Sequence, residues 1–200
     1  MSSTDIYGFR QDGTAYLYAS VRNSWRGAMA VWNKLEVKYL PPYIPGYIKA
    51  CNWYKPDMKY EEIVTRNGFR PTRLNSEISA REICDLADSP EVSEVDKTVL
   101  MTTFDNVVVR KADLPKIIEA FNQFVGETNL KEQAEVLQVM YEDDDCIAVA
   151  WNQTSVNADM WVCYSCNEAT EESTPYNIFK HDKHWFMFND NTDKPGGNNE

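Results

Sequence analysis

Histidine is scarce in this chain, and long apolar runs are absent. The 200 residues include two histidines, and no apolar run approaches the roughly 20 residues that a membrane-spanning helix needs. Residues 1–5 lack the basic and apolar regions of a signal peptide. We therefore expect a protein that makes no contact with a membrane and stays in the cytoplasm where it is made.

Common catalytic motifs are also missing. The sequence has no Gly-rich phosphate loop, no nucleophile elbow and no HExxH. With so few histidines, the usual triads lose their most common base. Carboxylates are plentiful, but their spacing singles out no acid–base pair. We expect no enzyme activity, no catalytic residues and no cofactor, and a metal-dependent enzyme is the less favoured alternative.

The cysteines and histidines allow one metal hypothesis. Five cysteines, an odd number at irregular spacing, favour reduced thiols in a chain this long. Cys163, Cys166, His181 and His184 are ligand types that zinc prefers. However, the two histidines are closer together than in usual zinc sites, and the two cysteines would point to opposite faces of a strand. We favour a buried thiol and two histidines at a hairpin tip, and predict no metal.

Charge is distributed unevenly along the chain. The net charge of −11 combines +4 over residues 1–80 with −15 over residues 81–200. Such a field repels nucleic acid and attracts basic protein surfaces. Acidic surfaces also keep proteins soluble, so this pattern alone does not require a partner.

The stretch from Cys146 to Cys166 organises the predicted fold. Two apolar runs, 146–151 and 160–164, flank a polar octet and predict a β-hairpin with a long loop. Another hairpin is expected at 5–9 and 15–21, around the turn signal Asp12-Gly13. A third is expected at 98–104 and 107–111. With the later strands 176–179 and 185–188, the last four strands would form an antiparallel meander.

Helical periodicity and capping signals predict the remaining elements. Helices are expected at 25–39, where Trp25 and Trp32 would be buried, at 57–68, from 79 to about 87, at 113–126 and from 129 to about 141. The fold class is α+β, an antiparallel sheet built from N- and C-terminal hairpins with four or five helices packed on it. We expect one domain over residues 1–188 and a disordered polar tail over 189–200.

Three segments are candidates for binding a ligand or partner. The first supplies amides and hydroxyls for a neutral polar ligand or a peptide backbone, or forms a self-satisfied loop. The second is an acidic run that sits in water at a fraying helix end or holds a divalent cation. The third suits a phosphate or an intramolecular clamp, and the acidic net charge favours the clamp. The three sets are Asn152, Gln153, Thr154, Ser155 and Asn157; Glu142, Asp143, Asp144 and Asp145; and Arg66, Arg70 and Arg73.

Several segments give the chain a family resemblance. Residues 22–32, 147–156, 5–8, 113–121 and 184–188 resemble a family of uncharacterised bacteriophage and prophage proteins, so that the resemblance spans most of residues 4–188. It implies a bacterial cytoplasm during infection, and it brings no catalytic residues to carry over.

This resemblance leads to two functional hypotheses. The first is a phage accessory protein that binds a host protein with a basic surface, as an inhibitor of a CRISPR effector or of another defence enzyme. The second is a binder of a nucleotide-like ligand, in which Arg66, Arg70 and Arg73 meet the phosphate and an aromatic such as Trp25 stacks on the base. Neither hypothesis involves direct binding of nucleic acid or a membrane.

Overall fold

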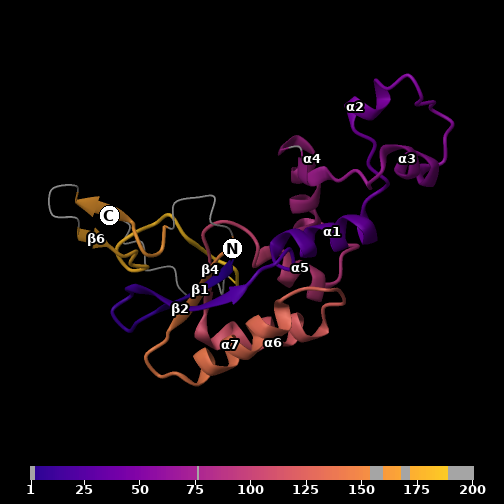
Figure 1. Ribbon diagram of the computed structural model, residues 1–200. Helices are drawn as coiled ribbons and strands as arrows, with labels where there is room; N and C mark the ends of the chain where they lie inside the picture. Colours follow the sequence, from indigo (N-terminus) through magenta and orange to yellow (C-terminus); the bar gives the residue numbers. More distant parts are fainter. Residues whose placement is uncertain (1–2, 76, 154–159, 168–171, 189–200) are drawn as a thin grey trace, which may run out of the picture.

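The centre of the molecule is a five-stranded sheet with strand order β2-β1-β4-β3-β7 (Figure 1). The computed structural model describes residues 3–75, 77–153, 160–167 and 172–188. The strands are β1 (Ser3–Phe9), β2 (Ala15–Arg22), β3 (Val107–Arg110), β4 (Ala148–Asn152) and β7 (Trp185–Phe186). All neighbours pair antiparallel except β3 and β7, which are parallel. The α+β class is confirmed, with a mixed sheet where an antiparallel one was predicted.

The predicted N-terminal hairpin is confirmed. β1 and β2 pair through the 10–14 turn, where Gly13 has a φ of 83° and the Thr14 amide donates to the Asp12 carboxylate (2.9 Å). Gly8 in β1 lies against the ring of Tyr16, whose nearest atoms would be 2.7 Å from an added Cβ. The hairpin therefore needs glycine at Gly8 for packing and at Gly13 for backbone conformation.

Strand β4 is buried on both faces. Val149 and Trp151 pack into the core cluster on the helical side, whereas Ala148 and Ala150 belong to a second cluster on the opposite side. None of these four side chains is more than 4% exposed. Because successive side chains of a strand point to opposite faces, a continuous apolar run is what a central strand requires.

Helices cover one face of this sheet. The main contributors are α1 (Ala28–Tyr39), α5 (Glu94–Met101), α6 (Leu114–Gln123) and α7 (Leu130–Glu142). Leu35, Leu100, Phe121 and Leu137 from these four helices are all buried in one cluster with the strands. Figure 1 shows α6 and α7 side by side below the sheet. The predicted helices at 113–126 and 129–141 are thus confirmed, with slightly different ends.

The other face of the sheet is covered by the C-terminal part of the chain. Trp161, Tyr176 and Ile178 are buried against Tyr7 and Phe9 of β1. Trp161 meets Phe9 and Tyr176 edge-on, with ring centroids 5.6 and 5.2 Å apart. Within the apolar run at 160–164, which was expected to be core, Trp161 is buried whereas Val162 is 39% exposed.

The pairing predicted for the C-terminal segments is wrong. The run at 160–164 forms a turn rather than the partner strand of β4, because β1 and β3 already occupy both edges of that strand. Residues 176–179 make one isolated bridge, between Thr14 and Asn177, and β7 pairs with β3. A separate two-stranded ribbon joins β5 (Ser165–Asn167) to β6 (Glu172–Thr174). The predicted tail at 189–200 lies outside the described residues.

The predicted hairpin at 98–111 is also wrong in its first half. Residues 98–101 belong to helix α5, whose N-cap Ser93 accepts a hydrogen bond from the Asp96 amide (3.2 Å). This cap and an apolar face that includes Val99 outweigh the strand preference of the branched residues. Only the second half, β3, is a strand.

Helix α1 starts later than predicted. Ser24 and Trp25 have positive φ angles of 43° and 67°, and the side chain of Asn23 accepts a hydrogen bond from the Gly27 amide (2.9 Å). The segment before Ala28 is therefore a turn, and Trp25 is 80% exposed instead of buried. Trp32, the second predicted core tryptophan of this helix, is partly buried.

Smaller helices form the region between α1 and α5. They are α2 (Gly46–Lys49), α3 (Tyr60–Asn67) and α4 (Glu77–Cys84), with 3-10 turns at Arg73–Asn75 and Asp85–Asp88. Gly68 ends α3 with a φ of 84°, as its sequence signal predicted. Figure 1 shows α2 and α3 at one end of the molecule, away from the sheet. In the described residues the sheet is thus accompanied by seven α-helices, more than predicted.

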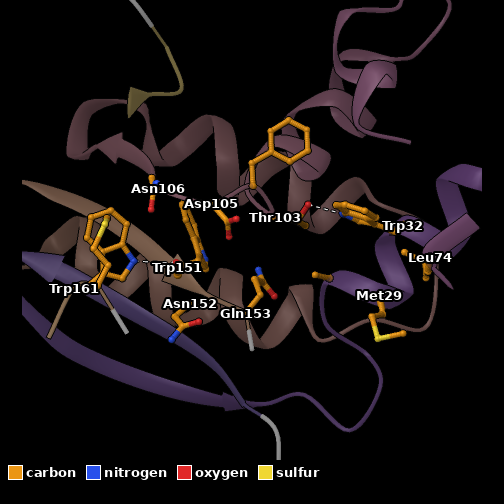
Figure 2. Close-up of a pocket in the computed structure, with 13 residues that line it drawn as sticks. Met29, Trp32, Leu74, Thr103, Asp105, Asn106, Trp151, Asn152, Gln153 and Trp161 are labelled. Atoms are coloured by element: carbon orange, nitrogen blue, oxygen red, sulfur yellow. Dashed lines mark hydrogen bonds between the residues drawn. The ribbon is translucent and has the colours of Figure 1, made fainter. Parts of the chain in front are cut away.

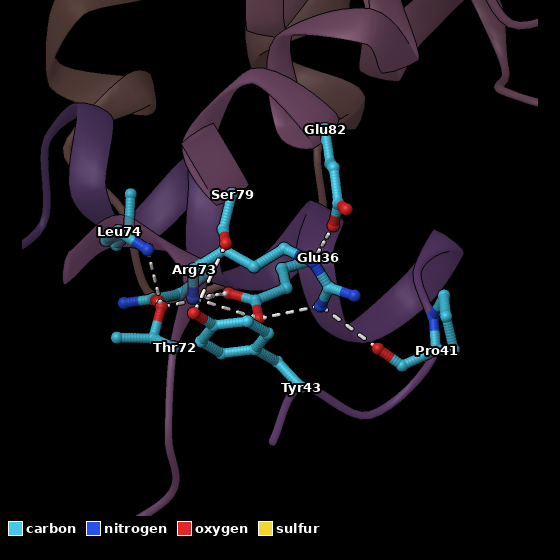
Figure 3. Close-up of polar contacts among 9 residues, drawn as sticks. Glu36, Pro41, Tyr43, Thr72, Arg73, Leu74, Ser79 and Glu82 are labelled. Carbon is cyan, nitrogen blue, oxygen red and sulfur yellow. Dashed lines mark hydrogen bonds and ion pairs between the residues drawn. The ribbon is translucent and has the colours of Figure 1, made fainter. Parts of the chain in front are cut away.

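A buried ion-pair network ties this region to α1 (Figure 3). Glu36 of α1 is 2% exposed and its carboxylate accepts hydrogen bonds from the Arg73 guanidinium (3.1 Å) and the Thr72 hydroxyl (2.9 Å). Arg73 also donates to the Pro41 carbonyl (3.0 Å) and to the carboxylate of Glu82 in α4. Arg73 therefore ties α1 and the residues directly after it to α4.

Removal of Arg73 alone should destabilise the fold strongly. Arg73→Leu leaves the Glu36 carboxylate buried without its cation, so we expect the free energy of unfolding to fall by about 3 kcal/mol. Urea unfolding followed by circular dichroism measures this change.

The matched controls are Arg70→Leu and a double variant. Arg70 is exposed, so Arg70→Leu should change the free energy by less than about 0.5 kcal/mol. Glu36→Leu with Arg73→Leu removes both charges and should recover part of the loss. Equal effects of Arg73→Leu and Arg70→Leu would show that the network contributes nothing.

Candidate functional site

A pocket of ≈380 Å³ opens where β4 ends (Figure 2). Its walls come from the start of α1, the loop between α5 and β3, the end of β4 and residues 160–161. This volume lies in the range that small-molecule sites occupy. The end of a central strand, a helix and a loop thus meet around one cavity.

Aromatic side chains form much of the pocket wall. They are Trp32, Phe104, Trp151 and Trp161. The indole N–H of Trp32 donates to the Thr103 hydroxyl (2.7 Å), and that of Trp161 donates to the Trp151 carbonyl (3.1 Å). Because each N–H is already engaged, both rings are fixed in orientation and offer the pocket apolar surface. The Trp151 N–H is buried and has no hydrogen-bond partner within the described part of the chain.

A tight turn places two polar side chains at the pocket. Asp105 and Asn106 connect α5 to β3, and Asn106 has a φ of 62°, a conformation that asparagine tolerates better than most residues. Trp185 holds this turn from outside. Its indole N–H donates to the Asp105 carbonyl (3.0 Å) and its amide donates to the Asn106 carbonyl (3.0 Å). Both backbone carbonyls are thereby engaged, which leaves the side chains to face the pocket.

A chain of buried amides fixes Gln153 on the opposite wall. The Gln133 amide group donates to the Asn129 side-chain oxygen (2.8 Å), and the Asn129 amide group donates to the Thr4 hydroxyl (3.2 Å). The Thr4 hydroxyl in turn donates to Oε1 of Gln153 (3.2 Å). Thr4, Asn129 and Gln133 are each fully buried. The chain therefore orients the Gln153 carboxamide with its oxygen used and its Nε2 group available to the pocket.

The pocket combines an oriented donor, the Gln153 Nε2 group, with an acceptor, the Asp105 carboxylate. Figure 2 shows the Asp105 carboxylate and the Gln153 carboxamide pointing into the same space between the aromatic walls. Among the described residues that line the pocket, Asp105 is the one acidic or basic side chain. The site thus suits a planar group that both donates and accepts hydrogen bonds, and it disfavours an anion.

Two of the predicted binding residues lie at this pocket. The structure puts Asn152 and Gln153 on the pocket wall, whereas Thr154, Ser155 and Asn157 lie outside the described residues. Sequence reasoning missed Trp32, Asp105 and Trp161 as site residues. Trp32 and Trp161 matched ordinary core patterns, and the Asp105-Asn106 turn signal was assigned to a hairpin, so no local signal connected them.

The three predicted arginines do not converge. Arg73 lies inside the network of Figure 3, with its guanidinium bound to Glu36 and Glu82. Arg66 ends α3 and Arg70 follows it, both exposed. Arg73 is therefore an intramolecular clamp, and it is not available to share a phosphate with Arg66 and Arg70.

The acidic run lies at the end of α7. Glu142 is the last helical residue, so the helix does not fray before the run as expected. Lys111 donates to the Asp143 carbonyl (2.6 Å), which places a cation at the helix C-terminus and offsets its dipole. Glu142, Asp144 and Asp145 are exposed. The run therefore presents carboxylates to solvent at a fixed position.

The cysteine and histidine candidates have other partners. Cys51, Cys84 and Cys146 are free thiols, but Cys163 is disulfide-bonded, which corrects the prediction of reduced thiols at that position. That prediction rested on chain length and spacing, which do not report the local approach of two sulfurs. A disulfide sulfur is not the thiolate that zinc binds. No cluster of three metal-ligating side chains occurs in the described ranges.

Both histidines belong to a tyrosine cluster. The His181 ring stacks on Tyr164 (centroids 3.8 Å apart), and its Nδ1 accepts from the Asn177 amide (3.0 Å). His184 Nδ1 lies 2.9 Å from the hydroxyl of the buried Tyr176. Burial lowers the pKa of His184 and raises the pKa of Tyr176. Burial therefore favours the neutral imidazole of His184 beside the Tyr176 hydroxyl.

Comparison with protein-family models, curated proteins and solved structures finds no match. Among the described residues, no helix is both long and apolar enough to cross a bilayer. Function therefore has to be argued from the chain's own geometry and charge.

The His184 environment predicts a pH dependence of stability. Its pKa in the folded state lies below the ordinary value of 6.5. The stability that depends on neutral His184 is therefore fully present above pH 6.5 and is lost as the pH falls below it. The thermal midpoint should therefore drop between pH of about 7 and about 5.5, and it should drop less in His184→Gln. Parallel curves for the two proteins would contradict this assignment.

Proposed function

We propose that this protein acts by binding a basic surface of another protein through the acidic outer face of α6 and α7. We define this acidic face by the exposed carboxylates of Glu119, Glu127, Glu132, Glu135, Glu142, Asp144 and Asp145. Residues 114–145 contain eight acidic and two basic side chains, a net charge of −6. This concentration of charge on one helical hairpin is the observation that carries the proposal.

The structure supports a common orientation for these carboxylates. Helices α6 and α7 pack their apolar sides onto one face of the sheet, so their exposed side chains point away from the core. A groove of ≈390 Å³ between the two helices is lined by the apolar Ile118 and Ala134, by Glu135, and by Asn122, Lys131 and Gln138. Val139 and Tyr141 of α7 add exposed apolar surface (56% and 40%). Exposed apolar side chains on a helical hairpin of net charge −6 suit a basic protein surface.

The composition of the pocket also favours binding over catalysis. General acid–base catalysis uses groups of separated pKa that act together, whereas Asp105 is the one acidic or basic side chain lining the pocket. Within the described residues, three potential metal ligands do not gather anywhere. A non-enzymatic role therefore accounts for the site with fewer assumptions.

The partner class follows from charge. An anionic face raises the association rate with proteins that carry a positive surface, and nucleic-acid-binding enzymes carry such surfaces. The sequence resembles bacteriophage and prophage proteins, which act inside a bacterial host. The partner would then be a host defence enzyme, such as a CRISPR effector. The bound protein would then occupy the surface that the enzyme needs for its nucleic acid.

Neutralising the acidic face should weaken partner capture. A variant with Glu135→Gln, Glu142→Gln, Asp144→Asn and Asp145→Asn removes four charges with little change of shape. We expect it to capture the host partner from bacterial lysate at least about tenfold less efficiently than the parent protein, because electrostatic steering is reduced. Quantitative mass spectrometry of the captured proteins measures the change.

The control variant removes the same charge elsewhere. Asp57→Asn, Asp85→Asn, Asp88→Asn and Glu91→Gln change exposed residues that lie outside α6 and α7. This variant should capture the partner nearly as well as the parent protein. If both variants lose capture equally, net charge and not the acidic face determines binding; if neither does, the proposal fails.

A further inference from the structure

We propose that the pocket at the end of β4 binds an uncharged planar heterocycle with a 2-amino-lactam edge, the chemistry that guanine and pterin rings share. The inference is separate from the acidic face, because the pocket is built mainly from α1, β4 and the α5–β3 turn and no residue of α6 or α7 lines it. It rests on the shape of the pocket, its hydrogen-bonding groups and its charge.

The shape of the pocket suits a flat ring. Trp32 and Trp161 have fixed orientations, because their indole N–H groups are already bonded to Thr103 and to the Trp151 carbonyl. Phe104 adds a third aromatic wall, and the volume is ≈380 Å³. Aromatic walls that are fixed before binding favour stacking of a planar ligand, because little side-chain freedom is lost.

The hydrogen-bonding groups select the edge of that ring. The Asp105 carboxylate has two acceptor oxygens, which match two adjacent N–H donors on a ligand. Gln153 presents its Nε2 donor, because its oxygen accepts from Thr4. A 2-amino-lactam offers two adjacent N–H donors followed by a carbonyl acceptor, so it satisfies both residues at once.

The preorganisation of Gln153 supports a built site over a chance cavity. Its carboxamide ends the buried chain from Gln133 through Asn129 to Thr4, all of which are fully buried. On the other wall, Trp185 holds the Asp105-Asn106 turn by two hydrogen bonds. The Gln153 donor and the backbone that carries the Asp105 acceptor are therefore each held by a separate part of the fold.

Because of its charge, the pocket should bind a free base or nucleoside more tightly than a nucleotide. Asp105 is the one charged lining residue, and the chain as a whole carries −11. A phosphate near the mouth would be repelled and would find no cation in the wall. An uncharged ligand is thus preferred over its phosphorylated form, and the difference should shrink at high salt.

Titration of the tryptophan fluorescence tests the proposal on the full chain. Guanosine and neopterin are the two probes, and they distinguish a purine source from a pterin source of the same edge. We expect saturable quenching by at least one of them. Binding of 1-methylguanosine should be at least about tenfold weaker than that of guanosine, since the methyl group removes one donor, and guanosine monophosphate should also bind more weakly. If neopterin alone quenches, the natural ligand is a pterin, and the assignment of the 2-amino-lactam edge still holds.

Two variants connect the signal to the pocket. Asp105→Asn keeps the shape of the side chain and the turn carbonyls but replaces one acceptor oxygen with a donor, so affinity should fall at least about tenfold. Asp88→Asn, an exposed residue outside the pocket, should bind like the parent protein. Absence of quenching by both probes at about 1 mM, or equal affinity of Asp105→Asn and the parent protein, would overturn the proposal.

Discussion

The burial of β4 on both faces is the constraint on which the rest of the structure depends. Val149 and Trp151 require a helical layer on one side, and Ala148 and Ala150 require cover on the other. The helices α1, α5, α6 and α7 satisfy the first requirement, and the segment with Trp161 and Tyr176 satisfies the second. Because β4 is central, Gln153 directly after it lies between both layers. That position creates the pocket around Gln153 and leaves the outer faces of α6 and α7 free to carry charge.

Local patterns predicted the elements better than their pairing. Turn residues, caps and periodicity predict the first hairpin, α3, α6 and α7, because these signals lie close together in the sequence within each element. The errors arose where distant segments compete for the same partner. The run at 160–164 has strand composition, yet β1 and β3 already occupy the edges of β4. Residues 98–101 have branched side chains, yet the Ser93 cap places them in a helix. Likewise Asn152 and Gln153 were found from local polarity, whereas Asp105 joins them only through the fold.

Charge and geometry give the protein two different surfaces. The acidic face of α6 and α7 is open to solvent and acts over a distance, so it suits encounter with a macromolecule. The pocket is small, aromatic and selective by hydrogen bonds, so it suits a ligand recognised at close range. The Arg73 clamp belongs to neither surface, because the Arg73 guanidinium is buried and bonded to Glu36 and Glu82. The proposed partner and the proposed ligand therefore concern two separate surfaces.

The salt dependence of the association rate with the captured partner tests the electrostatic account most directly. Interactions between exposed charges are screened over about 8 Å at physiological ionic strength, and steering is lost as the salt concentration rises. Stopped-flow measurements from low to high salt should therefore show an association rate constant that falls by at least about tenfold, with a much smaller change in the dissociation rate constant. An association rate constant that is independent of salt would contradict the proposal that the acidic face guides binding.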